Sequence, residues 1–203
     1  MPLLERIFGR KKVDQPIVIV SGLPRSGTSM MMKMLEAGGI APLTDNERTA
    51  DVDNPKGYYE FERVKQLDKG DTAWLPEARG KAVKVISALL KHLPREYHYK
   101  VIFMRRRLDE NIESQKKMLV NRGEDTDTVT DDELKALLQK HLDSIDQWLN
   151  QQPNIDLLYV PYHEMVEEPQ KNISSLNAFL GGELNTAKMQ SVVDERLYRN
   201  RAS

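Results

Sequence analysis

The sequence contains no cysteine and no long uninterrupted apolar segment. Without cysteine the chain cannot form disulfide bonds, use thiolate catalysis or build cysteine-based zinc sites. The lack of cysteine is compatible with a cytoplasmic protein, and that is the location we expect. No run approaches the roughly 18 apolar residues that a membrane-spanning helix needs, so we expect no integral membrane segment. The N-terminal stretch MPLLERIFGRKK favours a short amphipathic helix over a signal peptide, with attachment to a membrane surface as the open alternative.

Neither sign of charge dominates the 203 residues, which include 30 Lys and Arg against 31 Asp and Glu. A broad surface for nucleic acid or for an anionic membrane is therefore not expected, and an anionic ligand must be bound by locally concentrated cations. Hydrophobic residues make up 39% and charged residues 30%, as in a folded globular protein. The length suits one α/β domain, and we expect a single domain over residues 1–203.

Short apolar segments alternate with helical patterns along the chain. Four of these segments are predicted strands, at residues 16–20, 82–87, 100–104 and 156–160. Most are almost continuously apolar, which is typical of parallel strands covered on both faces. Helical patterns lie between the strands, and the last third of the chain is predicted to be helical. We therefore predict an α/β fold with a doubly wound, mostly parallel sheet flanked by helices.

The sequence GLPRSGTS at residues 22–29 follows the first predicted strand and precedes a helical pattern. The spacing of Gly22 and Gly27 is that of a P-loop, in which backbone N–H groups bind phosphate. Thr28 stands where a P-loop has its lysine, and Arg25 supplies a cation inside the loop. The residues expected to bind an anionic group are Arg25, Ser26, Gly27, Thr28 and Ser29.

A magnesium-bound nucleoside triphosphate does not suit this loop. In P-loop nucleotide triphosphatases the lysine reaches the terminal phosphates, and a carboxylate after another strand helps to hold Mg²⁺. Here no predicted strand ends in a carboxylate, and the strand at 100–104 runs into three arginines. The pattern predicts an anion bound by arginine, hydroxyl and backbone groups without a metal. A small-molecule kinase of the P-loop type is the less favoured alternative.

The three arginines, Arg105, Arg106 and Arg107, stand where the third predicted strand feeds a helix. Ligands of doubly wound proteins bind at this edge of the sheet. Consecutive residues point in different directions, so we expect only one of the three to face the ligand. We assign that role to Arg106, with Ser114 facing the same phosphate two helical turns later.

The loop and the arginine–serine pair together resemble the signatures of the sulfotransferase family. Residues 24–29 match the family's phosphosulfate loop, and Arg106 with Ser114 matches its arginine followed by a serine eight residues later. Three more segments are similar to bacterial members: NPKGYYE (54–60), YHEMVEEP (162–169) and LYRNR (197–201). The resemblance implies a P-loop-type α/β fold and an enzyme. That enzyme would transfer a sulfuryl group from 3′-phosphoadenosine 5′-phosphosulfate to a hydroxyl or amine of a small molecule or glycan.

The resemblance also implies roles for individual residues. By position, the loop residues would hold the 5′-phosphosulfate of the donor, and Arg106 with Ser114 would hold its 3′-phosphate. Tyr162 would approach the adenine, and Arg199 or Arg201 would join the 3′-phosphate clamp. No metal is implied. The sequence leaves the identity of the acceptor and the oligomeric state open.

The sequence departs from the family at the catalytic base. Many soluble members carry Lys-x-His where this chain has Lys84, Val85 and Ile86, so the histidine is absent. Other branches use a glutamate, and we assign the base to Glu60; the alternative is that Glu60 merely opens the next helix. Lys84 would stabilise the moving sulfonate, or would simply lie at a strand edge. The missing histidine also keeps open a non-catalytic nucleotide-binding or interaction protein on the same fold.

Overall fold

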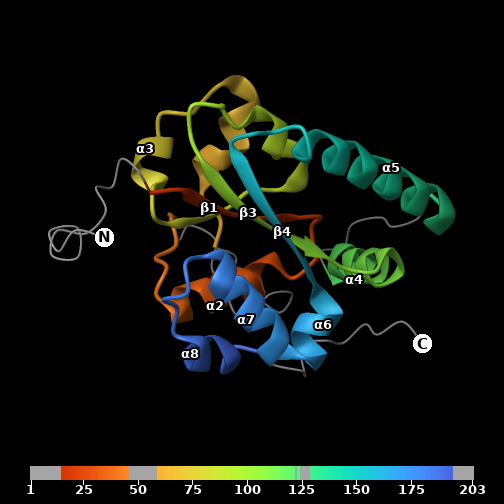
Figure 1. The fold of residues 1–203 in the computed structure, drawn as a ribbon. Coiled ribbons are helices and arrows are strands. Elements are labelled where there is room, and N and C mark those ends of the chain that lie inside the picture. Colours follow the sequence, from red (N-terminus) through yellow and green to blue (C-terminus); the bar gives the residue numbers. More distant parts are fainter. Residues whose placement is uncertain (1–14, 46–58, 122, 124–128, 194–203) are drawn as a thin grey trace, which may run out of the picture.

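The computed structural model describes residues 15–45, 59–121, 123 and 129–193 of the chain, and Figure 1 shows them as a central sheet between helices. The amphipathic segment predicted at the N-terminus lies outside these residues. Within the described ranges, no helix combines the length and the apolar character needed to cross a bilayer.

Four parallel strands of the described chain form one sheet in the order β2-β1-β3-β4. The strands are β1 (Ile17–Gly22), β2 (Ala82–Lys84), β3 (Tyr99–Arg105) and β4 (Ile155–Pro161). All six residues of β1 are buried, as the continuous apolar run predicted. The predicted strand at 82–87 is shorter than expected, because β2 ends at Lys84 and a 3₁₀ helix begins at Ser87.

Helices cover both faces of the sheet, as predicted for a doubly wound fold (Figure 1). One face packs against α2 (Thr28–Gly38), α6 (Tyr162–Glu167), α7 (Pro169–Phe179) and α8 (Thr186–Gln190). The other face packs against α3 (Leu75–Ala78), α5 (Asp131–Leu149) and the 3₁₀ helices η2 (Glu62–Lys69) and η3 (Ser87–His92). The predicted helical C-terminal third is therefore confirmed in α6, α7 and α8.

Alternate residues of β1 serve two separate apolar cores. Ile17 and Ile19 pack into the core shared with α3 and α5, whereas Val18 and Val20 pack into the core shared with α2 and α7. Burying one such side chain contributes about 1.5–3 kcal/mol relative to leaving it exposed. Both cores therefore hold β1 in place and fix the position of the loop that follows it.

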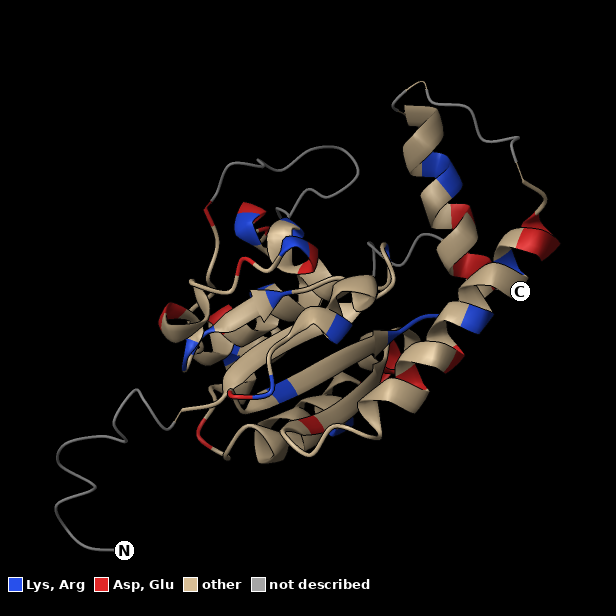
Figure 2. Ribbon diagram, turned by 90° about the horizontal axis from the view of Figure 1, so that it is seen from above, with Lys and Arg blue, Asp and Glu red and all other residues tan. Residues whose placement is uncertain are grey.

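Helix α4 (Leu108–Asn121) and the start of α5 extend beyond the sheet, with basic and acidic residues interspersed along them (Figure 2). Helix α5 begins at a capping box, in which the Thr130 hydroxyl accepts from the Glu133 N–H at 3.3 Å and the Glu133 carboxylate accepts from the Thr130 N–H at 3.1 Å. These two hydrogen bonds explain why α5 begins where it does.

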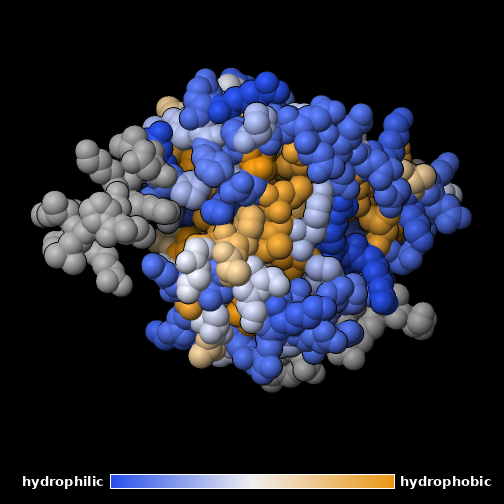
Figure 3. All heavy atoms as spheres, in the orientation of Figure 1, coloured by the Kyte–Doolittle hydropathy of each residue, from blue (hydrophilic) through white to orange (hydrophobic). Residues whose placement is uncertain are grey.

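On the face seen in Figure 3, apolar surface lies between the polar surfaces of the flanking helices.

The order of the strands places a topological switch point between the ends of β1 and β3. After β1 the chain passes to β2 on one side, and after β2 it crosses to β3 on the other side of β1. Ligands of doubly wound proteins bind at such a switch point, outside the carboxyl ends of the strands. Gly22 pairs with Met104 at this edge, so the glycine loop lies beside the arginines that follow β3.

Candidate active site

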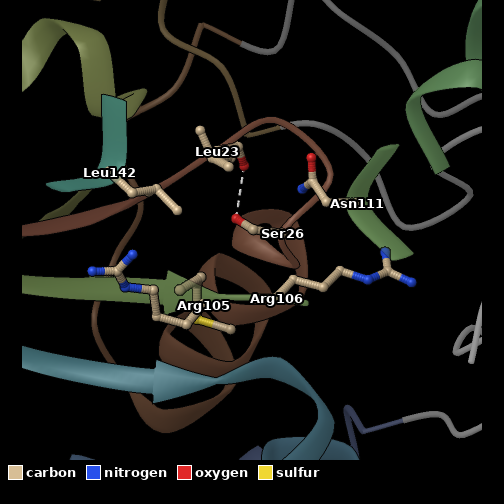
Figure 4. Close-up of a pocket in the computed structure, with 7 residues that line it drawn as sticks. Leu23, Ser26, Arg105, Arg106, Asn111 and Leu142 are labelled. Carbon is tan, nitrogen blue, oxygen red and sulfur yellow. Dashed lines mark hydrogen bonds between the residues drawn. The ribbon is translucent and has the colours of Figure 1, made fainter. Parts of the chain in front are cut away.

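Residues 23–27 form a tight turn between β1 and α2. The Ser26 N–H and the Ser26 hydroxyl both donate to the Leu23 carbonyl, at 3.2 and 2.7 Å (Figure 4). Gly27 has a φ of 94°, and a Cβ there would lie 2.3 Å from the Tyr162 ring, so only glycine fits. Helix α2 begins directly afterwards at Thr28, and the N–H groups of its first turn, which the helix itself cannot pair, face the loop.

Side chains that follow β3 hold the loop from outside. Nη1 of Arg106 donates to the Arg25 carbonyl at 3.0 Å, and Nδ2 of Asn111 donates to the Pro24 carbonyl at 2.8 Å. Nε of Arg25 donates in turn to Oγ of Ser114 at 3.1 Å. The structure thus brings together Arg25, Arg106 and Ser114, which the sequence analysis had selected from two separate motifs.

The three consecutive arginines point in different directions, as expected. Arg105 forms an ion pair with Asp146 and lies 5.0 Å from the centre of the Tyr159 ring. Arg106 extends away from Arg105 towards the loop (Figure 4). The side chain of Arg107 is 52% exposed. Of the three, Arg106 is the arginine that contacts the loop.

The environment of Arg106 includes a buried carboxylate that the sequence analysis did not select. Glu110 is 1% exposed, accepts from Nε of Arg106 at 3.3 Å and lies 3.8 Å from Nη1 of Arg107. The Arg106 guanidinium lies 4.9 Å from the centre of the Tyr162 ring. Burial raises the pKa of the Tyr162 phenol above its ordinary value, so the ring stays neutral beside the arginine.

A small hollow lies beside the loop, between α4 and α5 (Figure 4). Its lining comes from the loop, the end of β3 and these two helices: Leu23, Ser26, Met104, Arg105, Arg106, Asn111 and Leu142. Tyr162 does not line this hollow but packs behind the loop against Gly27 and is 6% exposed. Its contact with an adenine stays a prediction.

Glu60 and Lys84, the two residues assigned to catalysis outside the loop, meet at the carboxyl end of β2. Nζ of Lys84 lies 3.7 Å from Oε1 of Glu60, and the two side chains are 13% and 20% exposed. Nζ of Lys65 lies 3.9 Å from the other carboxylate oxygen. Glu60 does not open the next helix, because η2 begins two residues later at Glu62.

The backbone around Glu60 is held on two sides. Thr44 donates its hydroxyl to the Glu60 carbonyl at 2.7 Å. Tyr59 has a φ of 53°, and its hydroxyl donates to the Glu36 carboxylate on α2 at 2.6 Å. A left-handed backbone at a bulky residue costs on the order of 1–3 kcal/mol and persists only where the surroundings impose it. These contacts hold the backbone beside Glu60, whose carboxylate lies at the end of β2, and no motif predicted them.

The position of the family's missing histidine is taken by a partly exposed apolar residue. Ile86 is 45% exposed, and His92, the next histidine along the chain, is also exposed. Ser87 is hydrogen-bonded to Nε2 of His141 from α5 at 2.8 Å. Burial lowers the pKa of His141, which favours the neutral ring at pH 7. This bond ties α5 to the segment that follows Lys84.

Two residues assigned to the 3′-phosphate clamp, Arg199 and Arg201, lie outside the described part of the chain. Their role stays a prediction. Thr28 and Ser29 lie in the first turn of α2, directly after the loop, as expected for hydroxyls that face an anion there.

Comparisons with known proteins agree with this geometry. The sulfotransferase domain family matches residues 15–201, which is most of the chain. A search among curated proteins gave no match.

Several solved structures share the fold. The sulfotransferase STF9 from Mycobacterium avium is 14% identical, with a TM-score of 0.54 over 98% of this chain and 72% of that chain. A sulfotransferase domain from the curacin biosynthetic pathway is 15% identical, with a TM-score of 0.53 over 89% of this chain and 78% of that domain. The sulfotransferase domain of the Synechococcus PCC 7002 olefin synthase is 15% identical, with a TM-score of 0.54 over 92% and 83%. At these identities the structural likeness shows the fold alone. The family match over residues 15–201 shows that this chain belongs to the sulfotransferase family and is a sulfotransferase enzyme.

Proposed function

We propose that this sulfotransferase transfers the sulfuryl group of 3′-phosphoadenosine 5′-phosphosulfate to a hydroxyl or amine of a small molecule or glycan. The observation that carries the proposal is the set of contacts between the glycine loop and α4. Nε of Arg25 reaches Oγ of Ser114 at 3.1 Å, and Arg106 reaches the loop backbone at 3.0 Å. The donor carries an anionic group at each end of its ribose, and these residues offer a cation and hydroxyls to each.

The residues of this chain fit such a donor by their chemistry. The loop N–H groups, Arg25 and the hydroxyls of Thr28 and Ser29 are suited to the 5′-phosphosulfate. Arg106 and Ser114 are suited to the 3′-phosphate, because a guanidinium binds phosphate through charge-assisted hydrogen bonds. The nearby Glu110 offsets part of this positive charge and holds the guanidinium of Arg106 in one orientation.

In the proposed reaction an acceptor oxygen or nitrogen forms a bond to sulfur, and the bond between sulfur and the oxygen of the 5′-phosphate breaks. Glu60 takes the proton that the acceptor loses. Lys84, 3.7 Å from that carboxylate, stabilises the sulfonate as it moves. Arg25 stabilises the negative charge that builds on the leaving phosphate oxygen.

The experiment that tests this function is a transfer assay with the labelled donor and a mixture of hydroxyl and amine acceptors. Label is expected to appear on at least one acceptor in a protein-dependent manner. Tight binding of adenosine 3′,5′-bisphosphate without any transfer would instead support the non-catalytic nucleotide-binding alternative.

Nucleotide binding is expected to need no divalent metal. The four strands of the described chain end in Gly22, Lys84, Arg105 and Pro161, so none of them ends in the carboxylate that usually helps to hold Mg²⁺. Thr28 stands in place of the lysine that reaches the terminal phosphates of a triphosphate. Calorimetric titration with adenosine 3′,5′-bisphosphate should give the same affinity with a chelator and with Mg²⁺. A large loss of affinity in the chelator would restore the kinase alternative.

Removing either member of the arginine–serine pair is expected to weaken binding of the 3′-phosphate. A charge-assisted hydrogen bond contributes about 1.5–3 kcal/mol, so Arg106→Ala should weaken adenosine 3′,5′-bisphosphate about tenfold or more. Ser114→Ala should weaken it in the same direction by a smaller factor. Titration with adenosine 5′-phosphate, which lacks the 3′ group, is the control. Equal losses for both nucleotides in both variants would contradict the assignment.

A further inference from the structure

We propose that Asn111 and Gln115 on α4 are positioning residues that set the backbone of the glycine loop for the 5′ end of the donor. The inference deepens the proposed function and rests on it, since it takes the loop to bind a phosphate group. The family motifs and the sequence analysis assign no role to either residue.

The loop contains a turn that is unfavourable for its own sequence. Arg25 has a φ of 66°, in the left-handed region that side-chain-bearing residues rarely adopt. The turn is closed by the Ser26 N–H, which donates to the Leu23 carbonyl at 3.2 Å. A turn with positive φ at its third residue usually has glycine or asparagine there. With arginine in that position, the turn depends on contacts from outside.

Asn111 supplies such a contact. Its side chain is fully buried, and Nδ2 donates to the Pro24 carbonyl at 2.8 Å. Gln115, one helical turn later, donates from Nε2 to Oδ1 of Asn111 at 2.7 Å. This second bond decides which end of the Asn111 amide faces the loop, because the amide oxygen is already occupied. The pair therefore presents a donor to the Pro24 carbonyl.

The direction of that carbonyl controls what the loop offers to a ligand. The C=O and N–H of one trans peptide point in opposite directions. Holding the Pro24 carbonyl on the α4 side directs the N–H of Arg25 away from α4. If the peptide between Pro24 and Arg25 flipped, the loop would present the Pro24 carbonyl oxygen to the ligand instead of the Arg25 N–H. A carbonyl oxygen repels an anion.

Asn111 separates this positioning effect from direct ligand binding. Arg106 holds the next carbonyl, that of Arg25, but Arg106 carries a charge that itself attracts phosphate. Asn111 carries no charge and spends both ends of its amide on protein groups. A buried amide is costly unless it is hydrogen-bonded, so an apolar residue would serve better if filling space were the only requirement.

The test compares two nucleotides by calorimetric titration. Asn111→Leu, which is close in shape, should weaken adenosine 3′,5′-bisphosphate about tenfold, equivalent to about 1.4 kcal/mol. Binding of adenosine 3′-phosphate, which lacks the 5′ group, should change less than about twofold. Gln115→Ala frees the Asn111 amide to turn and should weaken the bisphosphate about threefold, again with little effect on the 3′-phosphate.

The control is Gln139→Ala, which removes an exposed amide that donates to Asp143 on α5 at 2.8 Å, and neither affinity should change. Equal weakening of both nucleotides in Asn111→Leu would show a general structural role and overturn the proposal, as would an unchanged affinity for the bisphosphate. If Asn111→Leu fails to fold, the same comparison of the two nucleotides in Gln115→Ala tests the proposal. Absence of any bisphosphate binding in the unsubstituted protein would refute the proposed function itself.

Discussion

Replacing Arg25 with alanine is expected to lower the turnover of sulfuryl transfer by about 10²–10³ while changing donor affinity much less. Arg25 carries the only positive charge of the loop at residues 22–29. Its guanidinium lies at Ser114, so the side chain spans the space between the loop and the arginine–serine pair. In the proposed reaction, negative charge on the leaving phosphate oxygen grows as the bond to sulfur breaks. A cation that interacts more strongly with this oxygen in the transition state accelerates the step.

The alanine substitution tests the loss of the guanidinium separately from any change in the backbone. Alanine and arginine both have a Cβ, so the left-handed backbone at φ 66° is unfavourable to a similar degree for both residues. Turnover and nucleotide affinity should be measured separately, since the expected loss is in turnover. Arg107→Ala is the matched control, because it also removes an arginine from the carboxyl edge of the sheet, after β3, where the side chain is 52% exposed. Unchanged turnover in Arg25→Ala would rule out the assigned role.

The strands and the loop were predictable because their signals are local. The apolar run of β1 predicted a buried central strand, and the glycine spacing predicted the turn that follows it. The apolar run at 82–87 predicts one strand over its whole length, but β2 ends at Lys84. Hydrophobicity does not distinguish a buried residue from a partly exposed one, and Ile86 near the end of that run is 45% exposed.

The site was predictable only where a motif carried the signal. Arg106 and Ser114 were selected by their spacing, and the structure places both against the loop or its arginine. Asn111 was missed because its partner, the Pro24 carbonyl, lies 87 residues earlier in the chain. No periodicity of the sequence encodes such a contact. Tyr59 was missed because a left-handed tyrosine is imposed by its surroundings rather than by its own preference.

Glu60→Gln is expected to lower turnover by about 10²–10⁴ while leaving the affinity for adenosine 3′,5′-bisphosphate nearly unchanged. Glutamine keeps the size and most of the hydrogen-bonding shape of glutamate but cannot accept the acceptor's proton. The motive for this prediction is the position of the Glu60 carboxylate, which lies 3.7 Å from Lys84 at the same edge of the sheet as the loop. Thr44 and Tyr59 hold the backbone on either side, so the substitution should not move the segment.

Two control variants distinguish the loss of a base from a loss of charge balance. Lys65→Ala removes the ammonium group that lies 3.9 Å from Glu60, on a side chain that is 56% exposed. If Glu60→Gln acted only through the charge balance, Lys65→Ala should change turnover by a similar factor. His92→Ala removes an exposed histidine at the end of η3, beyond the position of the family's base, and should be almost silent. If Glu60 is the base, Glu60→Gln is the one variant of these three that loses turnover by orders of magnitude. Normal turnover in Glu60→Gln would exclude the role, and a comparable loss in His92→Ala would move the search for the base to the histidines.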